Sequence, residues 1–140
     1  QDRITLISMM PEDFRSVYMA IMASNPDEVY YLAGQSSVSF SFEQPAETIQ
    51  SLVIGTLNML EAIRMTEKDI RFYHAGSSEC FGDTQGLKAN ENSPFRPKSP
   101  YGVAKSSAFW QVSNFRESYD LYACSGILLI MSLILDQADL

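Results

Sequence analysis

The chain has 140 residues, and its 46% hydrophobic and 19% charged content is that of a single globular domain, which excludes a disordered scaffold. Ten basic against 17 acidic side chains leave a formal charge of -7, and so acidic a surface repels phosphate backbones. We therefore expect no nucleic-acid partner. The most apolar run, residues 126–135, is too short to cross a bilayer, and the two cysteines lack disulfide or zinc spacing. These features predict a cytoplasmic protein without a membrane partner.

Short apolar runs alternate along the chain with longer segments of helical periodicity. In chain order, we predict a strand at 4–8, a helix at 12–23, a strand at 28–33, a helix at 45–65, a strand at 70–75, a helix at 101–118 and a strand at 121–128. Such alternation predicts an α/β fold, a doubly wound parallel sheet that binds its ligands at the carboxyl ends of the strands.

Tyr101 and Lys105 lie four residues apart in a predicted helix and therefore share one of its faces. The unperturbed pKa of a tyrosine, about 10, is too high for a base at neutral pH. A neighbouring ammonium group stabilises the phenolate and lowers that pKa, which would make Tyr101 a general base. Taken alone, the spacing also fits an exposed aromatic side chain beside an exposed cation.

Ser77, Ser78 and Glu79 directly follow the predicted strand at 70–75, and Tyr101 opens the next helix. Because neighbouring strand ends and helix starts converge in a parallel sheet, we expect a hydroxyl, a carboxylate, a phenol and an ammonium group in one crevice. The alternative is that Ser77 to Glu79 only form a polar cap between strand and loop. His74 is interpreted as a packed histidine, and no cluster of His, Cys and acidic residues has metal-ligand spacing, so we expect no metal site.

Three stretches of the sequence match a known family. They read YYLAGQSSVSFSF, FYHAGSSECFG and SPYGVAKSSAFWQVSNFRESYDLYA. Over about residues 2 to 128 the chain resembles the GDP-mannose 4,6-dehydratases, which are extended short-chain dehydrogenases/reductases with an NAD(P)-binding Rossmann-like domain. Ser77 stands where this family usually has threonine. The resemblance implies a lyase of nucleotide-sugar metabolism that uses NADP and acts on GDP-mannose.

The resemblance also implies a role for each candidate residue. Tyr101, assisted by Lys105, would take the proton of the sugar O4 while C4 is oxidised, and Ser77 would hydrogen-bond O4. Glu79 would remove the C5 proton so that water leaves from C6, and reduction at C6 would give GDP-4-keto-6-deoxy-mannose. The residues implied at the cofactor are Leu32, Ala33, Gly34, Ser36, Tyr101 and Lys105. The full-length form is implied to be a homodimer or homotetramer, with its contact on the helices near 48–65 and 101–118.

The chain departs from the family's pattern near both ends. The glycine-rich phosphate loop has no counterpart, and residues 4–8 resemble the family's third strand, so we expect them to lack a neighbouring strand. Residues 129–140 replace the family's usual continuation, and we interpret them as a reading shifted by one nucleotide. We therefore expect residues 1–140 to form an incomplete Rossmann domain, without its first two strands and the C-terminal substrate domain. Such a chain would bind NADP poorly and turn over nothing by itself.

Two other functions fit the same residues. One is a related nucleotide-sugar epimerase or ketoreductase, which would need no C5 base and is therefore distinguished by Glu79. The other is a non-catalytic remnant whose helices pair with a full-length partner.

Overall fold

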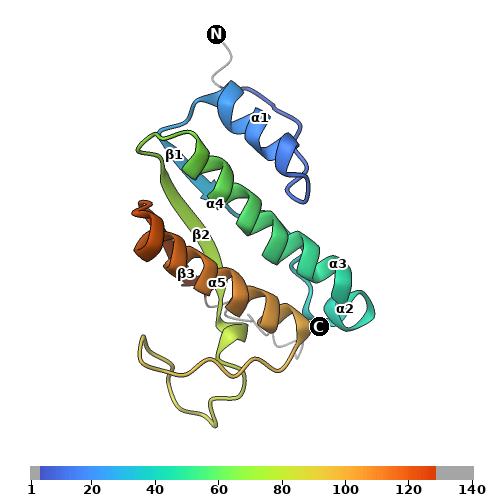
Figure 1. Ribbon diagram of the computed structural model, residues 1–140. Coiled ribbons are helices and arrows are strands. Elements are labelled where there is room, and N and C mark those ends of the chain that lie inside the picture. Colours follow the sequence, from blue (N-terminus) through green and yellow to red (C-terminus); the bar gives the residue numbers. More distant parts are fainter. Residues whose placement is uncertain (1–3, 129–140) are drawn as a thin grey trace, which may run out of the picture.

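A computed structural model of the chain describes residues 4–128. Its centre is a parallel sheet of three strands in the order β1 (Glu28–Tyr31), β2 (Arg71–Ser77) and β3 (Ala123–Leu128), which confirms the predicted α/β class (Figure 1). The interpretation of residues 129–140 falls outside the described residues.

Three long helices connect and cover the strands: α1 (Phe14–Ser24), α4 (Gly55–Met65) and α5 (Pro100–Tyr119). The shorter elements are α2 (Val38–Glu43), α3 (Pro45–Ile49), the π turn η1 (Gln50–Ile54) and the 3₁₀ turn η2 (Ser78–Cys80). α3, η1 and α4 follow one another without a break, so the predicted helix at 45–65 is confirmed as a continuous helical run that a π turn interrupts.

One face of the sheet carries the main core. The register pairs Phe72 with Ala123 and Tyr31 with His74, which places the side chains of these four residues on the same face. Against this face pack α1, α4 and α5, and Val17, Leu60 and Val112 of these helices are each 0% exposed. The main cluster consists of Val17, Ile21, Tyr31, Met59, Leu60, Ala62, Ile63, Ile70, Phe72, Val112, Phe115 and Ala123. The apolar faces of the helices and of the sheet thus form one apolar layer.

The strand predicted at residues 4–8 is wrong. Residues 4–10 have no regular structure, and Ile4 and Leu6 are exposed. A strand needs a neighbour to accept its backbone hydrogen bonds, and the described residues provide none for this segment, which agrees with the expectation that it lacks a neighbouring strand. The chain becomes regular at Asp13, whose carboxylate accepts the Arg15 and Ser16 N–H groups and caps α1.

Both cysteines are free: Cys80 is buried and Cys124 is exposed. Within residues 4–128, none of the helices combines the length and the hydropathy that a membrane crossing requires.

Candidate active site

The first part of the site is the carboxyl end of β2. Ser77 is the last residue of this strand and is only 6% exposed. Its Oγ accepts the backbone N–H of Glu79 over 3.3 Å and so caps the 3₁₀ turn η2. Ser77 therefore does form the polar cap that was the alternative interpretation. The same hydrogen bond holds Glu79 immediately beside Ser77. The side chain of Glu79 is exposed at the rim.

The second part is the first turn of α5, which packs directly on η2. The Ser99 Oγ accepts the Gly102 N–H over 3.0 Å, and Pro100 occupies the first helical position. A Cβ atom on Gly102 would lie 2.7 Å from the Glu79 carbonyl oxygen, which is too close for any side chain. Glycine at this position lets the helix approach the turn, and Tyr101 is thereby placed next to Ser77 and Glu79.

Tyr101 and Lys105 are both buried, at 7% and 8% exposure, so the alternative of an exposed aromatic beside an exposed cation is wrong. The Lys105 Nζ donates a hydrogen bond to the Ala75 carbonyl oxygen over 2.8 Å and lies 5.8 Å from the centre of the Tyr101 ring. The ammonium group is thus anchored to the backbone of β2, one turn of α5 away from the phenol.

The electrostatics of Tyr101 differ from the sequence expectation. Burial raises the pKa of Tyr101 above its ordinary value, a hydrogen bond of the Ser77 side chain opposes that rise, and the electrostatic effects of the Cys80 sulfur and the Glu79 carboxylate add to it. Lys105 does not lower the pKa of Tyr101 in this structure: burial is the largest influence on that pKa, and the Lys105 Nζ donates to the Ala75 carbonyl oxygen. Burial also lowers the pKa of Lys105. Both pKa shifts favour the neutral form of each group, and Ser77 and Glu79 both act on the phenol.

The residues predicted at the cofactor lie in the loop that follows β1. Leu32, Ala33, Gly34 and Ser36 are all exposed, and Gly34 has a φ of 114°, a conformation that other residues rarely adopt. Sequence reasoning missed Gln35. Its Oε1 is buried and has no hydrogen-bond partner among the described residues. A dinucleotide could lie against the exposed residues of this loop. The sequence feature that could have pointed to Gln35 is its position next to Gly34.

His74 is a packed histidine, as predicted. It is 2% exposed, and its Nδ1 lies 3.1 Å from the Ser125 Oγ. Burial and the positive charge of Lys105 lower the pKa of His74 to about 4. Within residues 4–128 there is no group of three His, Cys or acidic side chains that could hold a metal ion.

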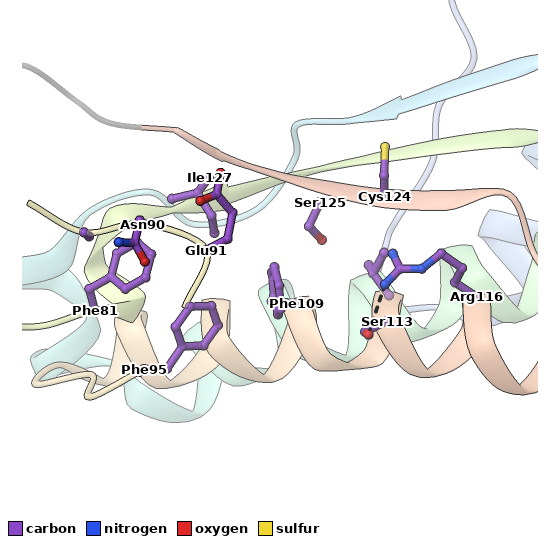
Figure 2. A pocket seen from close by; sticks show the side chains of 12 residues that line it. Phe81, Asn90, Glu91, Phe95, Phe109, Ser113, Arg116, Cys124, Ser125 and Ile127 are labelled. Carbon is purple, nitrogen blue, oxygen red and sulfur yellow. Dashed lines mark hydrogen bonds between the residues drawn. The ribbon is translucent and has the colours of Figure 1, made fainter. Parts of the chain in front are cut away.

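A cavity of about 590 Å³ lies elsewhere, between α5, β3 and the loop after η2. Phe81 and Phe95 lie at one end of it and Arg116 at the other, with Phe109 and Ser125 between them (Figure 2). Arg116 is already engaged, because it donates to the Ala123 carbonyl oxygen and to the Ser113 Oγ. None of the predicted catalytic or cofactor residues lines this cavity, so we place the candidate active site at Ser77, Glu79, Tyr101 and Lys105 instead.

The chain is similar to proteins of known activity. A family model described as GDP-mannose 4,6 dehydratase matches residues 1–131. The GDP-mannose 4,6-dehydratase of Vibrio cholerae is 52% identical over 105 residues, which cover 74% of this chain and 28% of that protein.

Two solved structures share the fold. The UDP-glucose 4-epimerase of Thermus thermophilus, in complex with NAD, has a TM-score of 0.77 at 29% identity, over 86% of this chain and 39% of that one. The RMD protein of Pseudomonas aeruginosa, complexed with NADPH, has a TM-score of 0.75 at 25% identity, over 89% of this chain and 42% of that one. The chain spans between 28% and 42% of the length of these three relatives. With the family model matching most of the chain, and with a buried Tyr101 and Lys105 beside Ser77 and Glu79, this chain belongs to the GDP-mannose 4,6-dehydratase family.

Proposed function

We propose that this chain carries the catalytic residues of an NADP-dependent lyase that converts GDP-mannose into GDP-4-keto-6-deoxy-mannose. The observation that supports the proposal most strongly is the packing of α5 on η2, which gathers a buried hydroxyl, a buried phenol, a buried ammonium group and a carboxylate at the end of one strand. Such an arrangement provides proton acceptors at two points of one sugar ring.

In the first half of the reaction, Tyr101 takes the proton from the sugar O4. Ser77, whose side chain acts on the Tyr101 phenol, would donate a hydrogen bond to O4 and hold the sugar in place. Tyr101 must be a phenolate to take this proton, and burial disfavours that form. In this proposal, the charge of Lys105, 5.8 Å from the centre of the Tyr101 ring, opposes the effect of burial in a water-poor site. A bound nicotinamide would supply reversible hydride acceptance, so that oxidation at C4 followed by reduction at C6 would consume no cofactor overall.

In the second half, Glu79 acts as the base. The ketone at C4 makes the C5 proton acidic, and the Glu79 carboxylate removes it. Glu79 then passes that proton to the departing C6 hydroxyl, and the C6–O bond breaks to release water. An exposed carboxylate at the rim suits this role because it can reach the sugar from the solvent side.

The cofactor would lie against Leu32, Ala33, Gly34 and Ser36, with Tyr101 and Lys105 at its reactive end. Exposure of this loop and the NADPH in the Pseudomonas structure support this placement. A homodimer or homotetramer of the full-length form is part of the same proposal. α4 and α5 lie side by side (Figure 1), and they leave apolar Leu57 and Val103 exposed for a partner helix.

The test is the substitution Glu79→Gln in a form of the protein that converts GDP-mannose. If Glu79 is the C5 base, elimination is lost while oxidation at C4 continues, so reduced cofactor accumulates and is visible at its absorbance band. Glu117→Gln, which changes an exposed glutamate of α5, is the control. Normal product formation by the Glu79→Gln protein would show that Glu79 is not the C5 base. Conversion of a nucleotide sugar without loss of water by the unmodified protein would favour the second candidate, a nucleotide-sugar epimerase, which the similarity to the Thermus enzyme supports.

A further inference from the structure

The π turn η1 interrupts the helical run between α3 and α4. The Gly55 N–H donates to the Gln50 carbonyl oxygen, five residues back, instead of four as in an α-helix. One extra residue is therefore inserted in this turn. π turns are less favourable than α-helix and are found frequently at functional sites. The apolar spacing of the sequence continues through η1, so local preference does not explain the insertion.

On one side, η1 contacts the loop after β1. Ser51 is 8% exposed, and its Oγ accepts the Gln35 backbone N–H over 3.0 Å. A Cβ atom on Gly34 would lie 3.3 Å from this Oγ and 2.5 Å from the Leu52 Cδ2. The loop thus rests directly on the π turn, and Ser51 holds it by a hydrogen bond to its backbone.

On the other side, η1 contacts the start of α5. Leu52 is 2% exposed and belongs to a second, smaller cluster with Tyr101 and Ala104. Two successive residues of the same turn therefore touch the two halves of the candidate site: Ser51 touches the loop proposed to hold the cofactor, and Leu52 touches the proposed base.

We propose that Ser51 is a positioning residue, which fixes the Gln35 backbone so that the loop after β1 is held at a set distance from Tyr101. The inference rests on the proposed function, because the proposed function assigns the loop after β1 to the cofactor. Removing the inserted residue would rotate the side chains on one side of η1 by about 100° relative to those on the other side.

The experiment measures amide hydrogen exchange of the chain by NMR, with and without millimolar NADPH. Losing one neutral hydrogen bond in Ser51→Ala should speed exchange at Gln35 about five- to ten-fold, with little change in helical amides. Ser51→Thr keeps the hydroxyl and should restore protection. The matched control is Ser106→Ala, which removes an equally buried hydroxyl that donates to the Gly102 carbonyl oxygen.

NADPH separates this inference from the proposed function. Although binding is expected to be weak, we expect millimolar NADPH to shift the amide signals of residues 32–36 in the unmodified chain. In Ser51→Ala we expect the same shifts to need a several-fold higher concentration. If Ser51→Ala leaves Gln35 exchange or NADPH affinity unchanged while the unmodified chain responds, the role of Ser51 is wrong and the cofactor site stands. If the unmodified chain shows no shifts at residues 32–36, the cofactor site itself is wrong.

Discussion

The two clusters of buried residues differ in the polarity of the side chains around them. The main cluster contains twelve apolar residues and joins α1, α4 and α5 to all three strands. The smaller cluster of Leu52, Tyr101 and Ala104 is surrounded by buried polar side chains, among them Ser51, Ser77 and Lys105. Burying apolar surface stabilises a fold, whereas burying a hydroxyl or an ammonium group costs free energy unless it is well bonded. We therefore expect the main cluster to provide most of the stability and the smaller one to hold the residues proposed for catalysis.

The largest expected effect is in the main cluster. Leu60→Ala removes a side chain that is 0% exposed and should lower the free energy of unfolding by about 3 to 5 kcal/mol, measured by urea denaturation. Leu57→Ala, on the same helix but 36% exposed, should cost less than about 1 kcal/mol and serves as its control. Equal losses for the two variants would show that the main cluster is not where stability is concentrated.

Acid should weaken the fold through His74, which lies on the helix-covered face between the two clusters. Its pKa is about 4 in the folded chain and near 6.5 in the unfolded chain, so the unfolded state binds the proton first. Stability is therefore lost as the pH falls from about 6.5 to 4, by up to about 3 kcal/mol. His74→Gln should remove that part of the pH dependence. Identical slopes for the two proteins over this range would contradict the burial of an uncharged imidazole.

Lys105→Met should separate stability from chemistry in the smaller cluster. Methionine fills a similar volume without a buried charge, so the free energy of unfolding should stay within about 1 kcal/mol or rise slightly. Conversion of GDP-mannose, in a form of the protein that carries it out, should be lost because the phenolate of Tyr101 has no cation beside it. Strong destabilisation with retained conversion would show that Lys105 contributes to stability and not to the chemistry.

The smallest effect is expected at Tyr31, an exception within the main cluster. Its hydroxyl is buried without a partner among the described residues, and burial raises its pKa to about 12. Tyr31→Phe should therefore stabilise the fold by about 0.5 to 1 kcal/mol at neutral pH. Because the unfolded pKa is about 10, the parent chain should also lose stability as the pH rises from about 10 to 12, and Tyr31→Phe should not. Thermal unfolding at pH 7 and at pH 11 measures both.

The alternation of strands and helices was predictable because apolar periodicity is a local property. The helices with Leu60 and Val112 and the strand with Phe72 follow from it directly. The strand at 4–8 was predicted wrongly because the apolar pattern contains no information on whether a neighbouring strand exists. The π turn at Gln50–Ile54 could not be predicted, since it depends on what Ser51 and Leu52 contact.

The identities of the candidate residues were predictable from the sequence, but their electrostatics were not. Ser77, Glu79, Tyr101 and Lys105 are found together because parallel strand ends and helix starts converge. The pKa of Tyr101 was expected to fall and instead rises. Its burial depends on Leu52 and Ala104, which a spacing of four residues cannot reveal.

The central claim is that one site unites the loop after β1 with the end of β2, and NMR of the chain titrated with NADPH and GDP-mannose tests it most directly. The account predicts that NADPH shifts the signals of Leu32, Ala33, Gly34 and Ser36, and that GDP-mannose shifts those of Ser77 and Glu79. Shifts confined to Phe109, Ser125 and the other residues around the cavity between α5 and β3 would contradict it.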